Sequence, residues 1–167
     1  TSLLDYCQDR GLGLPQRLAL FLEVCEAVRH AHQQRVVHGD LKPANIMVAA
    51  DGRPRLLDFG ISELLEADPA TRDPTHTTPW LTPAYAAPEQ FLGKASYQSD
   101  IYSLGCIFYE MIVGRPPIFD PDPFKILGKA QQGRITPPRL RNNRIPRDVD
   151  EIIMRCLASK LEDRYQR

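Results

Sequence analysis

The chain has 167 residues, with 43% apolar and 25% charged side chains, and its 21 basic residues balance 21 acidic ones. This length supports one hydrophobic core, and the zero formal charge gives no electrostatic reason to expect nucleic acid as a partner. The longest apolar stretches, such as 107–113, are far shorter than the roughly 20 residues that cross a bilayer. We therefore expect no membrane segment in this chain and a cytoplasmic location, while membrane attachment through another part of the full-length protein stays open.

The first predicted helix covers residues 15–34, where apolar side chains recur every three or four positions between charged ones. Three β-prone runs follow, at 36–37, 46–48 and 55–57. The Asp-Gly pair at 51–52 predicts that a tight turn joins the last two runs into a hairpin.

Residues 58–89 contain several prolines and threonines and no helical period, which predicts a long irregular segment of the kind that usually carries function. The next stretch, 101–113, is apolar on nearly every side and predicts a helix in the centre of the domain. Ser99 or Asp100 is available as its N-cap, and Gly114 should end it.

The remaining residues predict a modest helix near 123–132, a basic proline-containing loop at 134–146 and an amphipathic helix at about 148–158. No internal repeat interrupts this pattern, so we expect a single domain or part of one. We also expect the four well-separated cysteines to be buried thiols in a reducing compartment; zinc is not expected, because no histidine pairs with a cysteine at ligand spacing. The cysteines are Cys7, Cys25, Cys106 and Cys156.

The most informative string is H-G-D-L-K-P-A-N at 38–45, which lies between two β-prone runs, and Asp58-Phe59-Gly60 follows one hairpin later. Two carboxylates, an amide and an ammonium should therefore meet at the mouth of the hairpin. Phosphoryl transfer from a nucleotide needs such groups: a carboxylate for the attacking hydroxyl, oxygen ligands for Mg²⁺, and a positive charge on the transferring phosphate.

Together with A-A-P-E at 86–89 and S-D-I-Y-S-L-G at 99–105, these strings resemble, in order and spacing, the C-terminal lobe of a eukaryotic-type protein serine/threonine kinase. Their residues resemble those of bacterial members of the family more than those of animal members. The resemblance covers 1–167. It implies a protein kinase-like α+β fold, a mainly helical lobe with a small β-hairpin at the active-site edge and no N-terminal lobe. Its catalytic loop would be 38–45 and its activation segment 58–89.

The resemblance also implies roles for individual residues, with ATP and Mg²⁺ as cofactors and the serine or threonine of a protein as the phosphate acceptor. Asp40 is similar to the catalytic base, and Lys42 to the lysine that contacts the γ-phosphate and favours alcohol acceptors over tyrosine. Asn45 and Asp58 correspond to the two magnesium ligands. Thr82 falls where the family has a threonine whose hydroxyl bridges the catalytic-loop aspartate and lysine.

Other matching positions are expected to be structural. His38 and Phe59 resemble a packed column that links the catalytic loop to the metal-binding loop. Glu89 should pair with Arg164 in a buried ion pair. Asp100 is similar to the aspartate that accepts hydrogen bonds from the catalytic-loop backbone, although plain N-capping of its helix is an alternative, and both roles are compatible.

The sequence departs from the family at two places. Gly39 stands where many regulated kinases have an arginine that binds a phosphorylated activation segment, so we predict that phosphorylation at Thr77 or Thr78 is not coupled to activity through residue 39. Leu81 replaces the glycine that commonly precedes the threonine at 82, so the backbone there should differ locally.

The chain contains no glycine-rich loop, no strand lysine for the α- and β-phosphates and no glutamate partner for it. We therefore expect a fragment of a longer polypeptide that has no useful kinase activity alone. Two other functions stay open. A small-molecule phosphotransferase of the aminoglycoside or choline type shares H-G-D but generally lacks Lys42, 59–60 and 87–89. A pseudokinase would have lost catalytic residues, but the candidate acids and amide are all present here.

Overall fold

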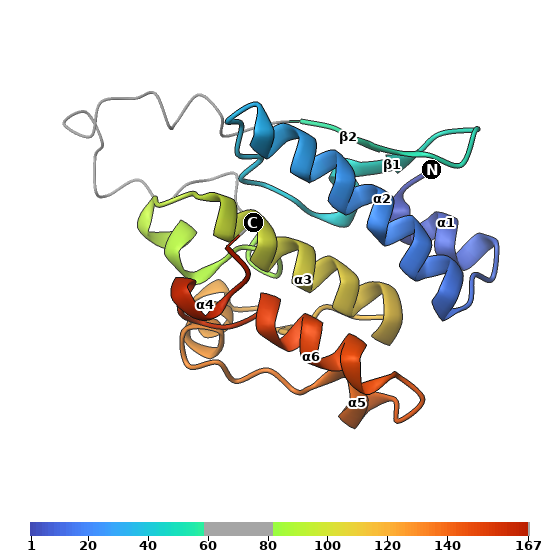
Figure 1. The fold of residues 1–167 in the computed structure, drawn as a ribbon. Helices are drawn as coiled ribbons and strands as arrows, with labels where there is room; N and C mark the ends of the chain where they lie inside the picture. Colours follow the sequence, from blue (N-terminus) through green and yellow to red (C-terminus); the bar gives the residue numbers. More distant parts are fainter. Residues whose placement is uncertain (59–81, 167) are drawn as a thin grey trace.

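The computed structural model describes residues 1–58 and 82–166 (Figure 1). The expectations for Phe59, Thr77, Thr78 and Leu81 lie outside the described residues. In chain order the elements are α1 (Leu3–Asp9), α2 (Leu14–Gln33), 3₁₀ helix η1 (Pro43–Asn45), β1 (Ile46–Val48), β2 (Pro54–Leu56), 3₁₀ helix η4 (Pro88–Leu92), α3 (Tyr97–Val113), α4 (Pro123–Gln131), α5 (Pro138–Arg141), α6 (Arg147–Cys156) and 3₁₀ helix η5 (Leu161–Asp163).

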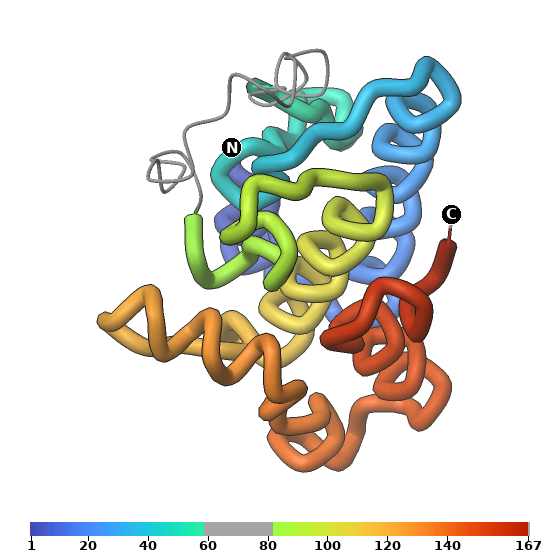
Figure 2. The backbone as a smooth tube through the Cα atoms, turned by 90° about the vertical axis from the view of Figure 1, so that its left-hand side faces the viewer, coloured from blue at the N-terminus to red at the C-terminus, as the bar shows by residue number. Residues whose placement is uncertain are grey.

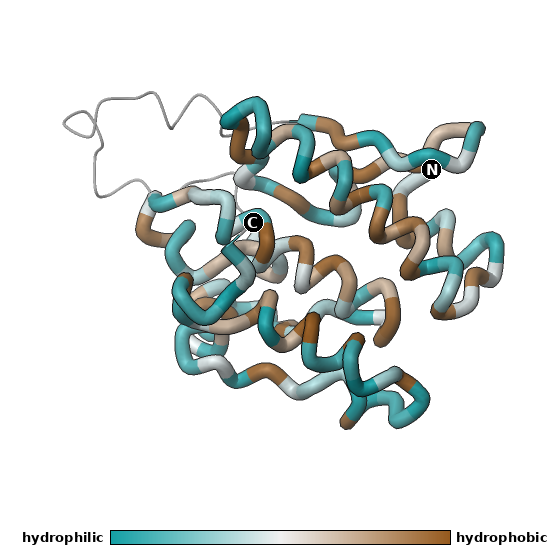
Figure 3. The backbone as a smooth tube through the Cα atoms, viewed as in Figure 1, coloured by the Kyte–Doolittle hydropathy of each residue, from teal (hydrophilic) through white to brown (hydrophobic). Residues whose placement is uncertain are grey.

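Helix α3 forms the centre of the fold, as the all-round apolar pattern predicts. It lies between α2 and α6, while the hairpin packs on α2 (Figure 1). Apolar residues recur along most of its length (Figure 3). The stacked rings of Phe21 and Phe108, 4.3 Å apart, join α2 to α3. On the opposite side Gly105 faces Cys156 so closely that a Cβ at 105 would lie 2.7 Å from the Cβ of Cys156.

The start of α3 differs from the prediction. The N-cap is Ser96, whose hydroxyl accepts from the amide of Ser99 while the Ser99 hydroxyl accepts from the amide of Ser96. This reciprocal capping box begins the helix at Tyr97, so the expected caps at Ser99 and Asp100 are wrong. Both residues lie inside the first turn and are buried. The predicted end is confirmed, because Gly114 adopts a left-handed φ of 87° that only glycine reaches without cost.

The β-hairpin is confirmed, with β1 and β2 antiparallel, and Gly52 in their turn has a φ of +80°. The expected β-run at 36–37 is not a strand. It is an extended connection after α2, where the amide of Val36 still donates to Ala31 and no strand in the described part of the chain pairs with it.

The remaining differences concern short elements. Helix α1 was not predicted, since only Leu3 and Cys7 on it are buried and so few positions show no period. Helix α5 interrupts the predicted loop at 134–146. Helices α2, α4 and α6 match the predicted ranges within two residues.

All four thiols are free, two of them buried and two half-buried. None of the helices in residues 1–58 and 82–166 is long and apolar enough to cross a membrane.

Candidate active site

The backbone of the 38–45 loop is held by one buried carboxylate. Asp100, 1% exposed at the start of α3, accepts from the amides of His38 and Gly39, both at 2.9 Å. Its Oδ2 also lies 2.8 Å from Nε2 of His32 on α2. The expected contact between Asp100 and the loop backbone is therefore confirmed, and the loop begins from a fixed position against the central helix.

His38 connects this loop to the residues after the hairpin. Its Nε2 lies 2.9 Å from the carbonyl oxygen of Leu57, and its Nδ1 lies 3.3 Å from the amide of Asp40. These contacts require a proton on Nε2 and a lone pair on Nδ1. The amide of Leu57 in turn donates to the carbonyl of Asn45 at 2.8 Å. The residue directly before Asp58 is thereby tied to both ends of the 38–45 loop.

Four of the five expected site residues meet in one cluster. The Lys42 ammonium lies 2.7 Å from Oδ2 of Asp40 and 3.0 Å from the hydroxyl of Thr82, which comes from a distant part of the chain. The side-chain amide of Asn45 donates to the carbonyl of Asp40 at 2.9 Å and to its Oδ2 at 3.3 Å. Asp40 and Lys42 remain partly open, with 15% and 23% of their side chains exposed.

The unused atoms of this cluster are oxygens. Within residues 1–58 and 82–166, no donor contacts Oδ1 of Asp40 or Oδ1 of Asn45, although Asn45 is only 7% exposed. A carboxylate oxygen without a donor can accept a proton, and an amide oxygen is a hard ligand. The ammonium of Lys42 places positive charge beside the Asp40 carboxylate.

Asp58, the fifth expected residue, follows Leu57 directly and is exposed. Its φ of 49° lies in the left-handed region, which is uncommon for a residue other than glycine. Among the described residues its carboxylate has neither a hydrogen bond nor an ion pair. Asp58 therefore directly follows the backbone hydrogen bond from Leu57 to Asn45.

The two candidate oxygen ligands, the Asp58 carboxylate and the Asn45 side-chain amide, suit Mg²⁺ bound together with phosphate and water better than a metal ion bound only by protein side chains. In the described part of the chain, no three His, Cys, Asp or Glu side chains come together as a metal cluster. One carboxylate and one amide oxygen match the way Mg²⁺ is usually bound, with phosphate oxygens and water completing its octahedron. Asp58 and Asn45 would supply these two oxygens.

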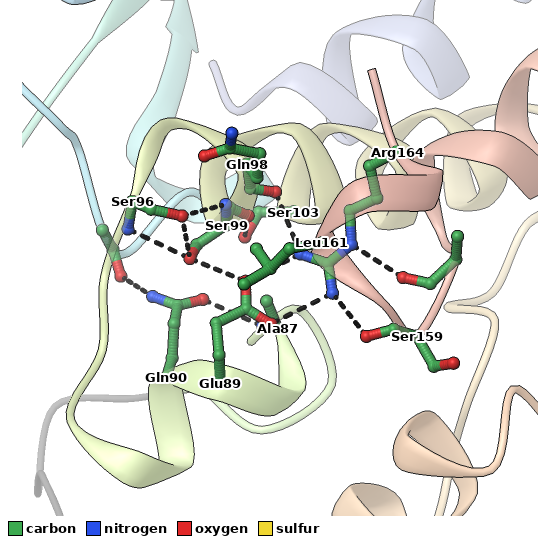
Figure 4. Close-up of polar contacts among 12 residues, drawn as sticks. Ala87, Glu89, Gln90, Ser96, Gln98, Ser99, Ser103, Ser159, Leu161 and Arg164 are labelled. Carbon is green, nitrogen blue, oxygen red and sulfur yellow. Dashed lines mark hydrogen bonds and ion pairs between the residues drawn. The ribbon is translucent and has the colours of Figure 1, made fainter. Parts of the chain in front are cut away.

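Arg164 anchors Glu89, which lies seven residues after Thr82, as Figure 4 shows for the Glu89–Arg164 contact. Arg164 is fully buried and forms a two-pronged ion pair with Glu89, at 2.7 Å and 3.0 Å. Glu89 also accepts from the hydroxyl of Ser99 at 2.8 Å. The expected Glu89–Arg164 pair is confirmed, and it fixes η4 against the first turn of α3.

Three contacts at the site were not predicted: the His32–Asp100 contact described above, a bond from Gln90 to the carbonyl of Gly39, and a 2.5 Å bond from the Tyr85 hydroxyl to Glu110. Burial raises the pKa of Tyr85, and it also raises the pKa of Glu110, for which the hydrogen bond from Tyr85 acts in the opposite direction. Gln90 follows A-A-P-E directly, but its bond to the backbone carbonyl of Gly39 leaves no pattern in the sequence of either segment.

A small recess separates the two segments that carry the cluster. Its walls come from 39–41 on one side and from Thr82, Tyr85, Ala86 and Gln90 on the other, and Ser103 of α3 closes it. Asp40 borders this recess.

Comparisons with known proteins show the family to which the chain is similar. The sequence model of the family described as "Protein kinase domain" matches residues 2–166. The chain is 33% identical over 168 residues to the serine/threonine-protein kinase PknB of Mycobacterium tuberculosis. It is 34% identical over 168 residues to PknB of Mycobacterium leprae, and 35% identical over 172 residues to a probable serine/threonine-protein kinase of Corynebacterium efficiens. Each alignment covers 99% of this chain and 26% of the relative, so the chain spans about a quarter of these proteins.

Proposed function

Because the chain belongs to the protein kinase family, we propose that its complete protein transfers the γ-phosphate of ATP to serine or threonine hydroxyls of other proteins. The observation that carries this proposal is the Lys42 ammonium, which contacts Asp40 and Thr82 at the same time. That triangle joins a base, a positive charge and a hydroxyl from the activation segment around the place where an alcohol would react.

In the proposed reaction, Asp40 orients the acceptor alcohol and takes its proton while the alcohol oxygen bonds to the γ-phosphorus and ADP leaves. Oδ1 is the oxygen for this task, since Oδ2 is occupied by Lys42. Lys42 places its positive charge beside the transferring phosphoryl group, and the hydrogen bond to the Thr82 hydroxyl fixes the position of the ammonium. Mg²⁺, when bound with ATP, supplies the charge that offsets the phosphates, and Asn45 and Asp58 would hold it.

We assign residues 1–167 to the C-terminal lobe of a kinase domain, with the catalytic loop at 38–45 and the activation segment at 58–89. We place the reaction in the cytoplasm. The four cysteines support that location, because they are free thiols, as is usual for proteins of a reducing compartment.

The test uses the complete protein that carries this chain, with radiolabelled ATP, magnesium and a mixture of protein acceptors. We expect label on phosphoserine or phosphothreonine after acid hydrolysis, and a loss of about 100-fold or more in the Asp40→Asn variant, which keeps the shape of the side chain but cannot act as a base.

Two other results would contradict the proposal. Label on an aminoglycoside or choline hydroxyl, with none on protein, would indicate a small-molecule phosphotransferase. ATP binding without transfer to any acceptor, equal in the wild type and the Asp40→Asn variant, would indicate a pseudokinase.

A further inference from the structure

Gln90 links the catalytic loop to the activation segment through a neutral side chain. Its Nε2 donates to the carbonyl of Gly39 at 2.6 Å, and its Oε1 accepts from the amide of Ala87 at 2.9 Å. The side chain is 4% exposed. Both ends of the amide are therefore used, and rotating or removing it would leave buried backbone groups without partners.

The carbonyl that Gln90 holds belongs to the peptide unit that leads into Asp40. The amide of that same unit donates to Nδ1 of His38, so the Gly39–Asp40 peptide plane is held at its oxygen and at its nitrogen. Gly39 has a left-handed φ of 76°, and its own amide is bound by Asp100. The direction in which the Asp40 side chain leaves the backbone depends on this plane.

The other end of the link is rigid. Gln90 lies in η4, next to Glu89, whose carboxylate is fixed by the buried Arg164 (Figure 4). A movement of η4 relative to the catalytic loop would break either the Glu89–Arg164 pair or the Gln90–Gly39 bond. Because Gly39 has no side chain, Gln90 supplies the only side chain in the contact between these two residues.

We propose that Gln90 is a positioning residue for Asp40: its amide fixes the Gly39–Asp40 peptide plane and couples the activation segment to the base without a phosphate group. The catalytic part of this inference rests on the proposed function. The coupling depends on a neutral hydrogen bond, so it needs no positively charged side chain at 39 and no phosphorylated partner.

The first experiment measures kinetics in the complete protein. Gln90→Met keeps the length of the side chain and removes both hydrogen bonds, and Gln131→Met makes the same change on an exposed position of α4. We expect Gln90→Met to lower kcat about tenfold and to leave the KM for ATP within about twofold, because the Gln90 side-chain amide bonds to the backbone of Gly39 and Ala87 and acts on the peptide that leads into Asp40. Gln131→Met should change neither. Unchanged kcat in Gln90→Met would overturn the proposal.

The second variant has a pH signature that a purely structural role does not produce. Gln90→Glu keeps the acceptor for Ala87, but an ionised carboxylate cannot donate to the Gly39 carbonyl, whereas a protonated carboxyl can. The kcat ratio of Gln90→Glu to wild type should therefore rise as the pH falls from about 8 to about 6, since burial favours the protonated acid. A ratio that does not change over this range would contradict the inference.

A third measurement separates this inference from the proposed function. Hydrogen exchange of the Gly39 and Asp40 amides needs no activity, and we expect it to be about tenfold faster in Gln90→Met, with α2 amides unchanged. If the wild type transfers no phosphate, the proposed function fails, and the exchange result still decides whether Gln90 holds the loop. Equal exchange in Gln90→Met, Gln131→Met and wild type would refute the link.

Discussion

Arg164 is a buried charge whose hydrogen-bonding capacity is fully used. A guanidinium has five N–H donors. They serve both oxygens of Glu89 and the backbone carbonyls of Gln98, Ala158 and Ser159. The planar group also lies over the ring of Tyr102, 4.9 Å from its centre. Because no donor is left without an acceptor, the cost of burying this charge is offset only while all the partners stay in place.

The first prediction removes one of those partners. Glu89→Gln keeps the shape of the side chain but leaves the Arg164 charge without a counterion, and we expect it to lower the free energy of unfolding by about 3–5 kcal/mol. The matched control is Glu26→Gln, which breaks the exposed pair with Arg29, where 63% and 65% of the side chains are accessible. That change should cost less than about 1 kcal/mol. Urea unfolding measures both, and equal losses would contradict the account.

A second prediction concerns Glu110, whose pKa is raised from 4.5 mainly by burial, against the opposing hydrogen bond from Tyr85. The folded protein therefore holds this proton more tightly than the unfolded chain. The stability that the group contributes is complete below the unfolded pKa and is lost as the pH rises through the folded pKa. Glu110→Gln has no proton to lose, so its stability relative to wild type should increase as the pH rises from about 4 to about 7.

Thermal unfolding across that pH range checks the sign. Glu23→Gln, at an exposed position of α2, is the control and should follow the wild type. A difference between Glu110→Gln and wild type that stays constant, or that shrinks as the pH rises, would show that the carboxyl is not protonated preferentially in the folded state.

At the scale of elements, the close approach of α3 and α6 depends on one glycine. A Cβ at Gly105 would lie 2.7 Å from Cys156 and 3.1 Å from Leu157, whereas Gly128 in α4 has nothing within 4 Å of that position. Gly105→Ala should therefore destabilise the fold by about 1–3 kcal/mol through overpacking. Gly128→Ala should stabilise it by up to about 1 kcal/mol, because alanine favours the helix.

Chemical unfolding of the two variants checks this contrast. The same substitution on two helices must give opposite signs if α3 and α6 pack as described. A stabilising effect at both positions would mean that the helices have room to separate at no cost.

The elements also show what the sequence can and cannot predict. Helices α2, α3 and α6 were predicted because each is long enough for its period of buried residues to appear. The start of α3 was not, since Ser96 and Ser99 both suit a cap, and only the reciprocal bonds between them decide which one acts. Residues 36–37 have strand-forming side chains, yet a strand also needs a neighbour to pair with, and their local sequence does not supply that information.

The same limit applies to the site. Asp40, Lys42 and Asn45 were predicted together because they are neighbours in one string, and Thr82 because the family resemblance supplied its place. His32 and Gln90 act on backbone or on a carboxylate far away in the chain, at separations of 68 and 51 positions. A contact of this kind depends on the packing of α2, α3 and η4, so it is visible only once the fold is known.

At the scale of the whole molecule, the other elements surround α3 (Figure 2). Of the four cysteines, Cys7 and Cys106 are buried, while Cys25 and Cys156 are half-buried. Burial raises the pKa of Cys25 and of Cys156 to about 12, and it raises those of Cys7 and Cys106 as well. The reactive form of cysteine is the thiolate. All four cysteines should therefore react with a disulfide reagent much more slowly in the folded protein than in denaturant, at pH about 8.

A time course of thiol release checks that prediction, counting thiols from these four positions by mass spectrometry of the labelled peptides. The prediction would be contradicted if any of the four cysteines were labelled as fast in the folded protein as in the unfolded chain. Such a residue would lie on a surface that the packing around α3 does not close.

In the proposed function, Asp40 and Asp58 serve one magnesium–nucleotide site in different roles, and the magnesium dependence of ATP binding by the complete protein tests this most directly. Asp58→Asn should raise the Mg²⁺ concentration for half-maximal binding by at least about tenfold, since it weakens a metal ligand. Asp40→Asn should leave that concentration within about twofold of wild type while lowering phosphate transfer about 100-fold or more. An identical magnesium requirement in wild type and both variants would contradict the account.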